Sequence, residues 1–202
     1  MKNQSRAFIS QLKAETSHQA VNGLEHHIET DINYDEDFSA NPCEPPDVHY
    51  MDAAQGWLEL GDASSALAEL TRVNPSLKNH PDVLLLSWDI RAALGHWNDA
   101  FKIGEELMRV IPDDFRSVVN RSIALRYMPG GGLQLAYDDL LRSEPYDWHV
   151  QYLLARYSCQ LGKLDEARQW LKRAGSGGGL KEKALDEPDL EPIWKFVDKG
   201  KW

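Results

Sequence analysis

The chain has 202 residues, of which 42% are hydrophobic and 9% aromatic, a composition typical of a globular protein with a buried core. Its formal net charge is −10 at neutral pH. Because nucleic-acid phosphates and anionic lipids attract positive surfaces, this charge argues against both as partners. No segment approaches the roughly 18 apolar residues of a membrane span, and no apolar run follows the first basic residues, so we expect a cytoplasmic protein. The two cysteines, Cys43 and Cys159, cannot build a disulfide framework or a four-thiolate zinc site.

Residues 1–46 are predicted to form an acidic N-terminal tail. Residues 1–47 hold three basic and nine acidic side chains, which accounts for −6 of the net charge of −10. Apolar residues between positions 5 and 14 fall near helical spacing and predict one short amphipathic helix. The segment DINYDEDFSANPCEPPD that follows has too little apolar surface to offset the entropy of ordering it, so we expect it to be flexible.

From residue 47 to residue 174 the sequence repeats a helical pair. The stretches LGDASSALAEL (60–70), LGHWNDAFKIGEEL (94–107) and LGKLDEARQWL (161–171) each place leucine before a turn glycine and alanine five residues after it. MPGGGLQLAYDDLL (128–141) is a degenerate fourth copy. The four alanines, at positions 66, 100, 136 and 167, are 34, 36 and 31 residues apart, close to the 34-residue period of tetratricopeptide repeats.

This period predicts an all-α fold, an α-solenoid of about four tetratricopeptide-type helix-turn-helix repeats. Glycine tolerates the backbone geometry of the tight turn, and alanine lets the two helices of a pair approach closely. Each hairpin is too small to bury its own apolar face and must stack on a neighbour. Residues 175–202, beginning with GSGGG, are predicted to be a linker and capping helices that cover the apolar face of the last repeat.

Between about His80 and Trp194 the chain resembles a family of small bacterial tetratricopeptide proteins. That family carries a YALHEL-like helix, then YNLACYxCQLGxxxEAxxWL, then ALxDPDLxPLW. Here the matching segments read SIALRYM (122–128), YLLARYSCQLGKLDEARQWL (152–171) and ALDEPDLEPIW (184–194). Leu153 and Arg156 replace the family's asparagine and cysteine, and the third pair carries an extra PGGG, so a ligand common to the family's groove need not be shared. The resemblance implies an architecture and an interaction role, without an assigned activity.

Several motifs that would indicate chemistry are incomplete. A phosphate-binding loop needs lysine and then serine or threonine directly after its last glycine, whereas GGGLKEK places leucine before the lysine and glutamate after it. The segment from Asp31 opens like a calcium loop, but Glu36 and Pro42 stand where glycine and a bidentate glutamate are required. No catalytic constellation stands out. We therefore expect no cofactor, no metal site and no enzyme, and a metal-binding or enzymatic role that uses the histidines and acids of the tail is the minority alternative.

The first helices of the pairs are expected to line a concave groove, and offsets from the turn glycines predict which side chains face it. Its second half carries arginines beside tyrosines. Because arginine presents a planar fork suited to carboxylates, an acidic or C-terminal peptide segment would fit there. The alternative is that these arginines are solvated or pair with Asp82 and Asp89 inside the groove. The predicted partner-binding residues are Gln55, Asp89, Arg116, Val119, Asn120, Ile123, Arg126, Tyr127, Tyr152 and Arg156.

The leading hypothesis from the sequence is a non-enzymatic protein-protein interaction scaffold whose partner is another protein or a peptide segment. An alternative is a dedicated chaperone or assembly factor that shields an apolar partner segment along Met51, Leu58, Leu85, Val119 and Ile123. The acidic tail either keeps the chain soluble or folds back onto the arginine-bearing half of the groove and blocks it.

Overall fold

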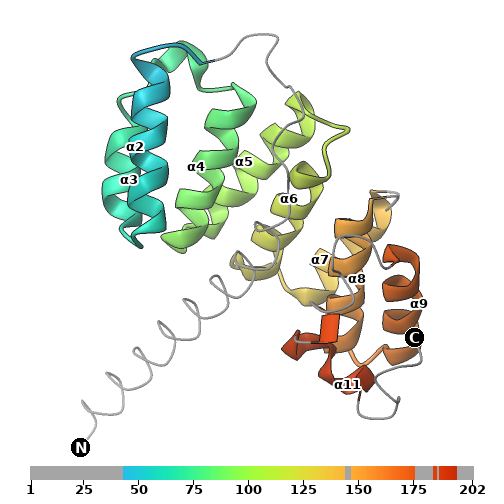
Figure 1. Ribbon diagram of the computed structural model, residues 1–202. Coiled ribbons are helices and arrows are strands. Elements are labelled where there is room, and N and C mark those ends of the chain that lie inside the picture. The colour runs from blue at the N-terminus through green and yellow to red at the C-terminus, as the bar shows by residue number, and fades with distance from the viewer. Residues whose placement is uncertain (1–42, 144–146, 176–183, 186, 195–202) are drawn as a thin grey trace, which may run out of the picture.

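The computed structural model describes residues 43–143, 147–175, 184–185 and 187–194 of the chain (Figure 1). The predictions for residues 1–42, including the acidic tail and its short helix, lie outside the described residues. So does most of the predicted linker, together with the end of the chain after Trp194.

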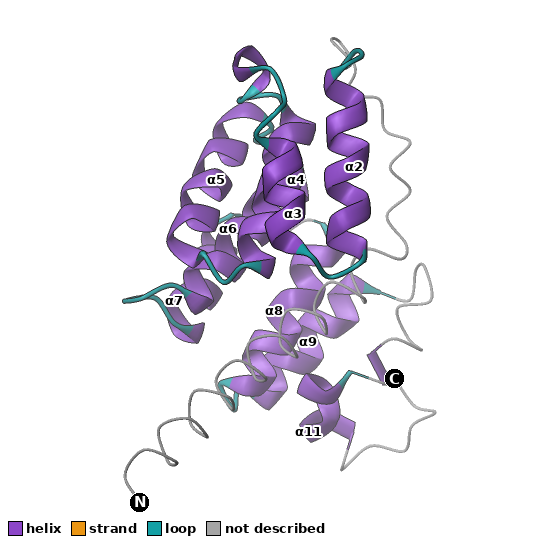
Figure 2. Ribbon diagram, turned by 90° about the vertical axis from the view of Figure 1, so that its left-hand side faces the viewer, coloured by secondary structure: helices purple, strands orange, loops and turns teal. Residues whose placement is uncertain are grey.

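Helices account for all the regular structure in the described part of the chain. Each helix packs against the next along the chain, so the fold is a row of sequential helical pairs (Figures 1 and 2). This confirms the predicted all-α, tetratricopeptide-type fold. The pairs are α2 (Asp47–Glu59) with α3 (Ala63–Leu70), α4 (Pro81–Ala93) with α5 (Trp97–Val110), α6 (Phe115–Tyr127) with α7 (Leu133–Arg142), and α8 (Trp148–Gln160) with α9 (Leu164–Ala174). Short 3-10 turns at η2 (Pro75–Leu77) and η4 (Pro188–Leu190), and the last helix α11 (Glu191–Trp194), complete the described elements.

The turns and crossings within the pairs follow from the repeated residues. The turn glycines Gly61, Gly95 and Gly162 have φ angles of 79°, 72° and 75°, in the left-handed region that glycine enters without steric cost. The four repeated alanines have no exposed surface, and a side chain this small lets two packed helices approach closely. Local sequence therefore sets the hairpin geometry.

The helix starts are set by side-chain caps. Asp62, Asp114 and Asp147 each accept a hydrogen bond from a backbone amide in the first turn of α3, α6 and α8 respectively. His80 does the same for α4 through its ring nitrogen. Such caps satisfy amides that have no partner inside the helix and oppose fraying at that end.

Two pairs approach each other closely where α5 crosses α6. A Cβ atom on Gly104 would lie 2.7 Å from Cα of Arg121, so only glycine fits at this position without a shift of one helix. The guanidinium of Arg121 then reaches Asp139 of α7, with Nη2 2.7 Å from Oδ1 and Nε 3.1 Å from Oδ2. Three consecutive helices are thus fixed to one another around a single residue of α6.

The core is continuous from pair to pair because some helices bury two faces. Trp88 of α4 and Tyr157 of α8 belong to one large apolar cluster that spans the second to fourth pairs. Ile90 of α4 belongs to the cluster of the first pair, and Cys159 of α8 belongs to the cluster beneath the C-terminal segment. This arrangement places α8 between the body of the solenoid and its C-terminal end.

Candidate protein-binding surface

The ten side chains predicted to bind a partner divide into buried and accessible groups. Val119, Ile123, Tyr152 and Arg156 are between 3% and 6% exposed, so in this structure they do not line an open surface. The physical reason is that α6 contacts α8 as well as α5 and α7, which buries Val119 and Ile123. The accessible residues are Gln55, which is exposed, and Asp89, Arg116, Asn120, Arg126 and Tyr127, which are partly exposed.

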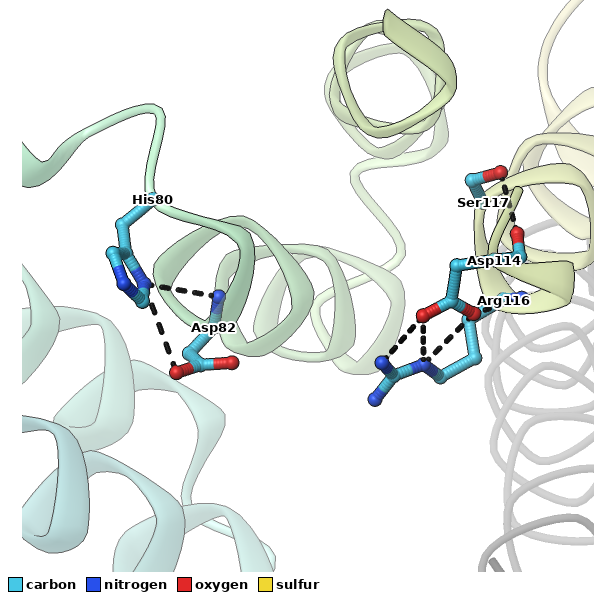
Figure 3. Close-up of polar contacts among 5 residues, drawn as sticks. All are labelled: His80, Asp82, Asp114, Arg116 and Ser117. Carbon is cyan, nitrogen blue, oxygen red and sulfur yellow. Dashed lines mark hydrogen bonds and ion pairs between the residues drawn. The ribbon is translucent and has the colours of Figure 1, made fainter. Parts of the chain in front are cut away.

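Arg116 is held by a carboxylate from its own helix start. Its Nε lies 3.0 and 2.9 Å from the two carboxylate oxygens of Asp114, the N-cap of α6, and its backbone amide donates to the same side chain at 2.8 Å (Figure 3). The sequence left open that the groove arginines pair with Asp82 or Asp89. Asp114 pairs with Arg116 in this structure, and Asp82 lies beside His80 at the start of α4, with Nδ1 of His80 3.7 Å from Oδ2.

Arg126 is held by aromatic rings. Its guanidinium carbon lies 5.1 Å from the ring centroids of both Tyr127 and Tyr157, within the range of cation-π attraction. The ring of Tyr127 in turn lies 4.8 Å from that of Trp97, at the start of α5. No carboxylate forms an ion pair with Arg126 among the residues that the structure describes. Its charge is therefore positioned by rings and is not neutralised by a described acid.

Tyr157 is the buried one of the two tyrosines that contact Arg126. It has no exposed surface, and its hydroxyl makes no hydrogen bond with the described residues. Burial raises the pKa of Tyr157 to about 12, against a partial opposing effect of the Arg126 charge. The phenol is thus neutral at physiological pH and does not compensate the charge on Arg126.

Arg156 binds an acidic segment of its own chain. Its Nη2 lies 2.8 Å from Oδ2 of Asp189, and its Nε lies 3.2 Å from Oε2 of Glu187. Burial opposes the charged form, but the two carboxylates outweigh it and raise the pKa of Arg156 above its ordinary value. From the sequence we expected Arg156 to face an external ligand. Nothing in the sequence pattern indicated that it pairs with Glu187 and Asp189, about 30 residues later in the chain.

His149 lies at the start of α8 in an aromatic stack. Its ring is 3.9 Å from that of Phe115 and 3.5 Å from that of Trp148, measured between centroids. Its Nδ1 lies 2.8 Å from Oδ1 of the N-cap Asp147, which also accepts a hydrogen bond from the His149 amide. Burial raises the pKa of Asp147, but these hydrogen bonds outweigh it, so the net pKa is lower than usual.

A search of the described residues for three or more metal-binding side chains in one place finds no such group. Within the same residues, no helix has the length and apolar character needed to cross a membrane.

Comparisons with known proteins relate this geometry to one solved fold. No protein-family model and no curated protein matches the chain. Solved structures do match, among them "MamA 41-end from Desulfovibrio magneticus RS-1" and "MamA RS-1 ArsTM double mutant". Each has a TM-score of 0.53 and 18% sequence identity, and the match covers 76% of this chain and 92% of the other. At this identity the comparison shows the fold, which is the MamA-like tetratricopeptide type.

Proposed function

We propose that the chain is a non-enzymatic scaffold that binds a segment of another protein along the first helices of its pairs. The fold supports this role, because stacked helical pairs present an extended surface on which few side chains set specificity. The observation that carries the proposal is Arg126, a partly exposed cation that is fixed between aromatic rings without a carboxylate partner among the described residues.

The chemistry around Arg126 favours an acidic segment or a chain terminus. A guanidinium binds a carboxylate through two parallel hydrogen bonds, and it does so at lower entropic cost when its orientation is already fixed. Asn120 and Tyr127 are seven residues apart on α6, which places them on one face of the helix. The amide of Asn120 can hydrogen-bond the backbone of an extended segment whose carboxylate is bound by Arg126.

The chaperone alternative is less well supported. Two of the five apolar residues that would shield a partner, Val119 and Ile123, are buried in the core. Met51, Leu58 and Leu85 remain partly exposed on the first two pairs. This alternative therefore retains a shorter apolar surface than the sequence indicated. The relationship to the small bacterial tetratricopeptide family, the cytoplasmic location and the absence of enzymatic activity stay predictions.

The test compares proteins retained from a lysate of the source organism by three full-length baits: wild type, Arg126→Glu and Arg142→Glu. Arg142 is an exposed arginine on α7, a second helix, and provides the matched control for charge reversal. We expect wild type and Arg142→Glu to retain the same partner and Arg126→Glu to lose it, with release of the partner at high salt. Circular dichroism must show equal helicity for the three baits. Retention of the same proteins by all three would contradict the proposal.

The tail hypothesis is tested separately by deleting residues 1–42. If the acidic tail competes for the arginine-bearing surface, the deletion raises the affinity for the partner identified above, and the increase shrinks at high salt. If the tail serves only for solubility, the affinity is unchanged and the deleted chain precipitates at lower concentration.

A further inference from the structure

The C-terminal cap, residues 187–194 with Ala184, lies against α8 and α9 at the end of the row of helices (Figures 1 and 2). It contacts the solenoid through a 3-10 turn of three residues and a helix of four. Elements this short are not stable in isolation, so their conformation depends on the surface beneath them. The cap therefore behaves as a bound segment rather than as a further helical pair.

The polar part of this contact is an acidic pattern bound to a buried arginine. Glu187 and Asp189, two residues apart, both contact the Arg156 guanidinium, whose side chain is 6% exposed. The Asp189 amide also donates to the Glu187 carboxylate at 3.2 Å, which fixes the two acids relative to each other. The cap thus makes the contact with arginine that we propose for an external acidic segment at Arg126.

The apolar part follows directly after the acids. Leu190, Ile193 and Trp194 are buried, and the Trp194 indole donates to the Ala184 carbonyl at 2.9 Å. They pack on a surface of α8 and α9 in which small and medium side chains predominate beside one tyrosine. That surface consists of Tyr152, Ala155, Cys159, Ala167, Leu171 and Ala174.

The energetics of this contact favour exchange. A buried ion pair gains little net free energy, since the cost of removing both charges from water offsets their attraction. Nη1 of Arg156 and the hydroxyl of Tyr152 are buried without a hydrogen bond to the described residues, so the cap leaves part of the polar surface unsatisfied. Covalent attachment also keeps the cap in place, since a short tether corresponds to a local concentration on the order of millimolar.

We propose that the cap is a built-in competitor for a binding site on α8 and α9. The partner segment that this site takes has the chemistry of the cap: two acidic residues two positions apart, a leucine directly after the second, and large apolar side chains three and four positions after that leucine. This deepens the proposed function, on which it rests, because it extends partner binding to the last helical pair and states what is recognised there.

The first experiment measures binding of a fluorescein-labelled peptide with the sequence of residues 184–194 to the full-length chain. Leu190→Lys removes the central apolar contact of the resident cap, and Glu191→Gln, at an exposed cap position, is the control. We expect the peptide to bind Leu190→Lys at least about 10-fold more tightly than wild type or the control, because the resident cap no longer competes. A peptide carrying Glu187→Lys and Asp189→Lys is expected not to bind. If Leu190→Lys keeps its helicity and binds neither peptide, the proposal is overturned.

A second measurement needs no change in the cap. Cys159 lies beneath the cap and is 4% exposed, so its reaction with a thiol reagent reports cap opening. In a full-length Cys43→Ser background we expect Cys159 to react at urea concentrations well below the loss of helicity, with a weaker dependence on urea than global unfolding. Reaction that follows global unfolding alone would show that the cap is an integral part of the fold. Neither measurement involves Arg126, so a failure here is distinguishable from a failure of the proposed function.

Discussion

Nη2 of Arg156 and Oδ2 of Asp189 lie 2.8 Å apart although 33 residues separate them in the sequence. In a rigid core, removal of one partner from such a pair costs about 3–5 kcal/mol, because the other charge stays buried and unpaired. Here the acids belong to the cap, which can lift away and let them hydrate. Arg156→Met is therefore expected to lower the free energy of unfolding by less than about 3 kcal/mol while it accelerates thiol labelling of Cys159 at least about 10-fold. A large fall in the urea midpoint without faster labelling would contradict this expectation.

Two helical glycines, Gly104 in α5 and Gly56 in α2, are expected to respond in opposite ways to substitution by alanine. Gly104→Ala places a Cβ 2.7 Å from the Arg121 backbone and is expected to destabilise the protein by about 1–3 kcal/mol. Gly56→Ala, inside α2 where the added Cβ meets nothing within 4 Å, is expected to stabilise it by about 0.5–1 kcal/mol. Urea unfolding followed by circular dichroism measures both. Stabilisation by both substitutions would show that helix propensity, and not packing, decides the effect at Gly104.

The lowered pKa of Asp147 predicts how the free energy of unfolding depends on pH in the acid range. Because its pKa is lowered in the folded protein, the stability that its ionised form contributes is present above the ordinary value of 3.8 and is lost as pH falls through the folded pKa. Asp147→Asn keeps an N-cap but not the charge, so its stability is expected to fall less than that of wild type in this acid range. Asp147→Ala, which also removes the cap, is expected to cost about 1 kcal/mol at neutral pH. Parallel acid curves for wild type and Asp147→Asn would show that ionisation of Asp147 does not contribute to stability.

The raised pKa of Tyr157 predicts how the stability of the protein changes at alkaline pH. Its pKa is raised to about 12, so stability is lost as pH rises from the ordinary value of 10 through 12, where the unfolded chain ionises first. Tyr157→Phe removes a buried hydroxyl without a hydrogen bond to the described residues, and we expect it to be neutral or slightly stabilising at pH 7 and to resist alkaline unfolding better than wild type. Urea midpoints at pH 7 and pH 11 check both statements. A substantial loss of stability at pH 7 would instead indicate that the hydroxyl makes a favourable contact.

The features predictable from the sequence are those set by neighbours in the chain. The turn at Gly95 and the crossing at Ala100 depend on residues a few positions apart, and the 34-residue period reports them directly. Ile123 is buried and Arg126 is partly exposed although both lie on α6, because their exposure depends on how α6 packs on α8. The residues near them in the sequence do not indicate how the two helices pack. Arg156 illustrates the same limit, since its acidic partners come from the segment that was expected only to cover an apolar face.

The helix α4 contributes buried side chains to three apolar clusters and α8 to two, so each helix joins adjacent parts of the core. In a linear array of repeats, the interfaces between neighbouring repeats contribute much of the free energy of unfolding. The described solenoid is therefore expected to melt in fewer cooperative blocks than it has helical pairs, because α4 and α8 couple the clusters on either side of them. A force applied to the two ends would release the cap first, then α9, and would meet its main resistance only when α8 is pulled from the central cluster.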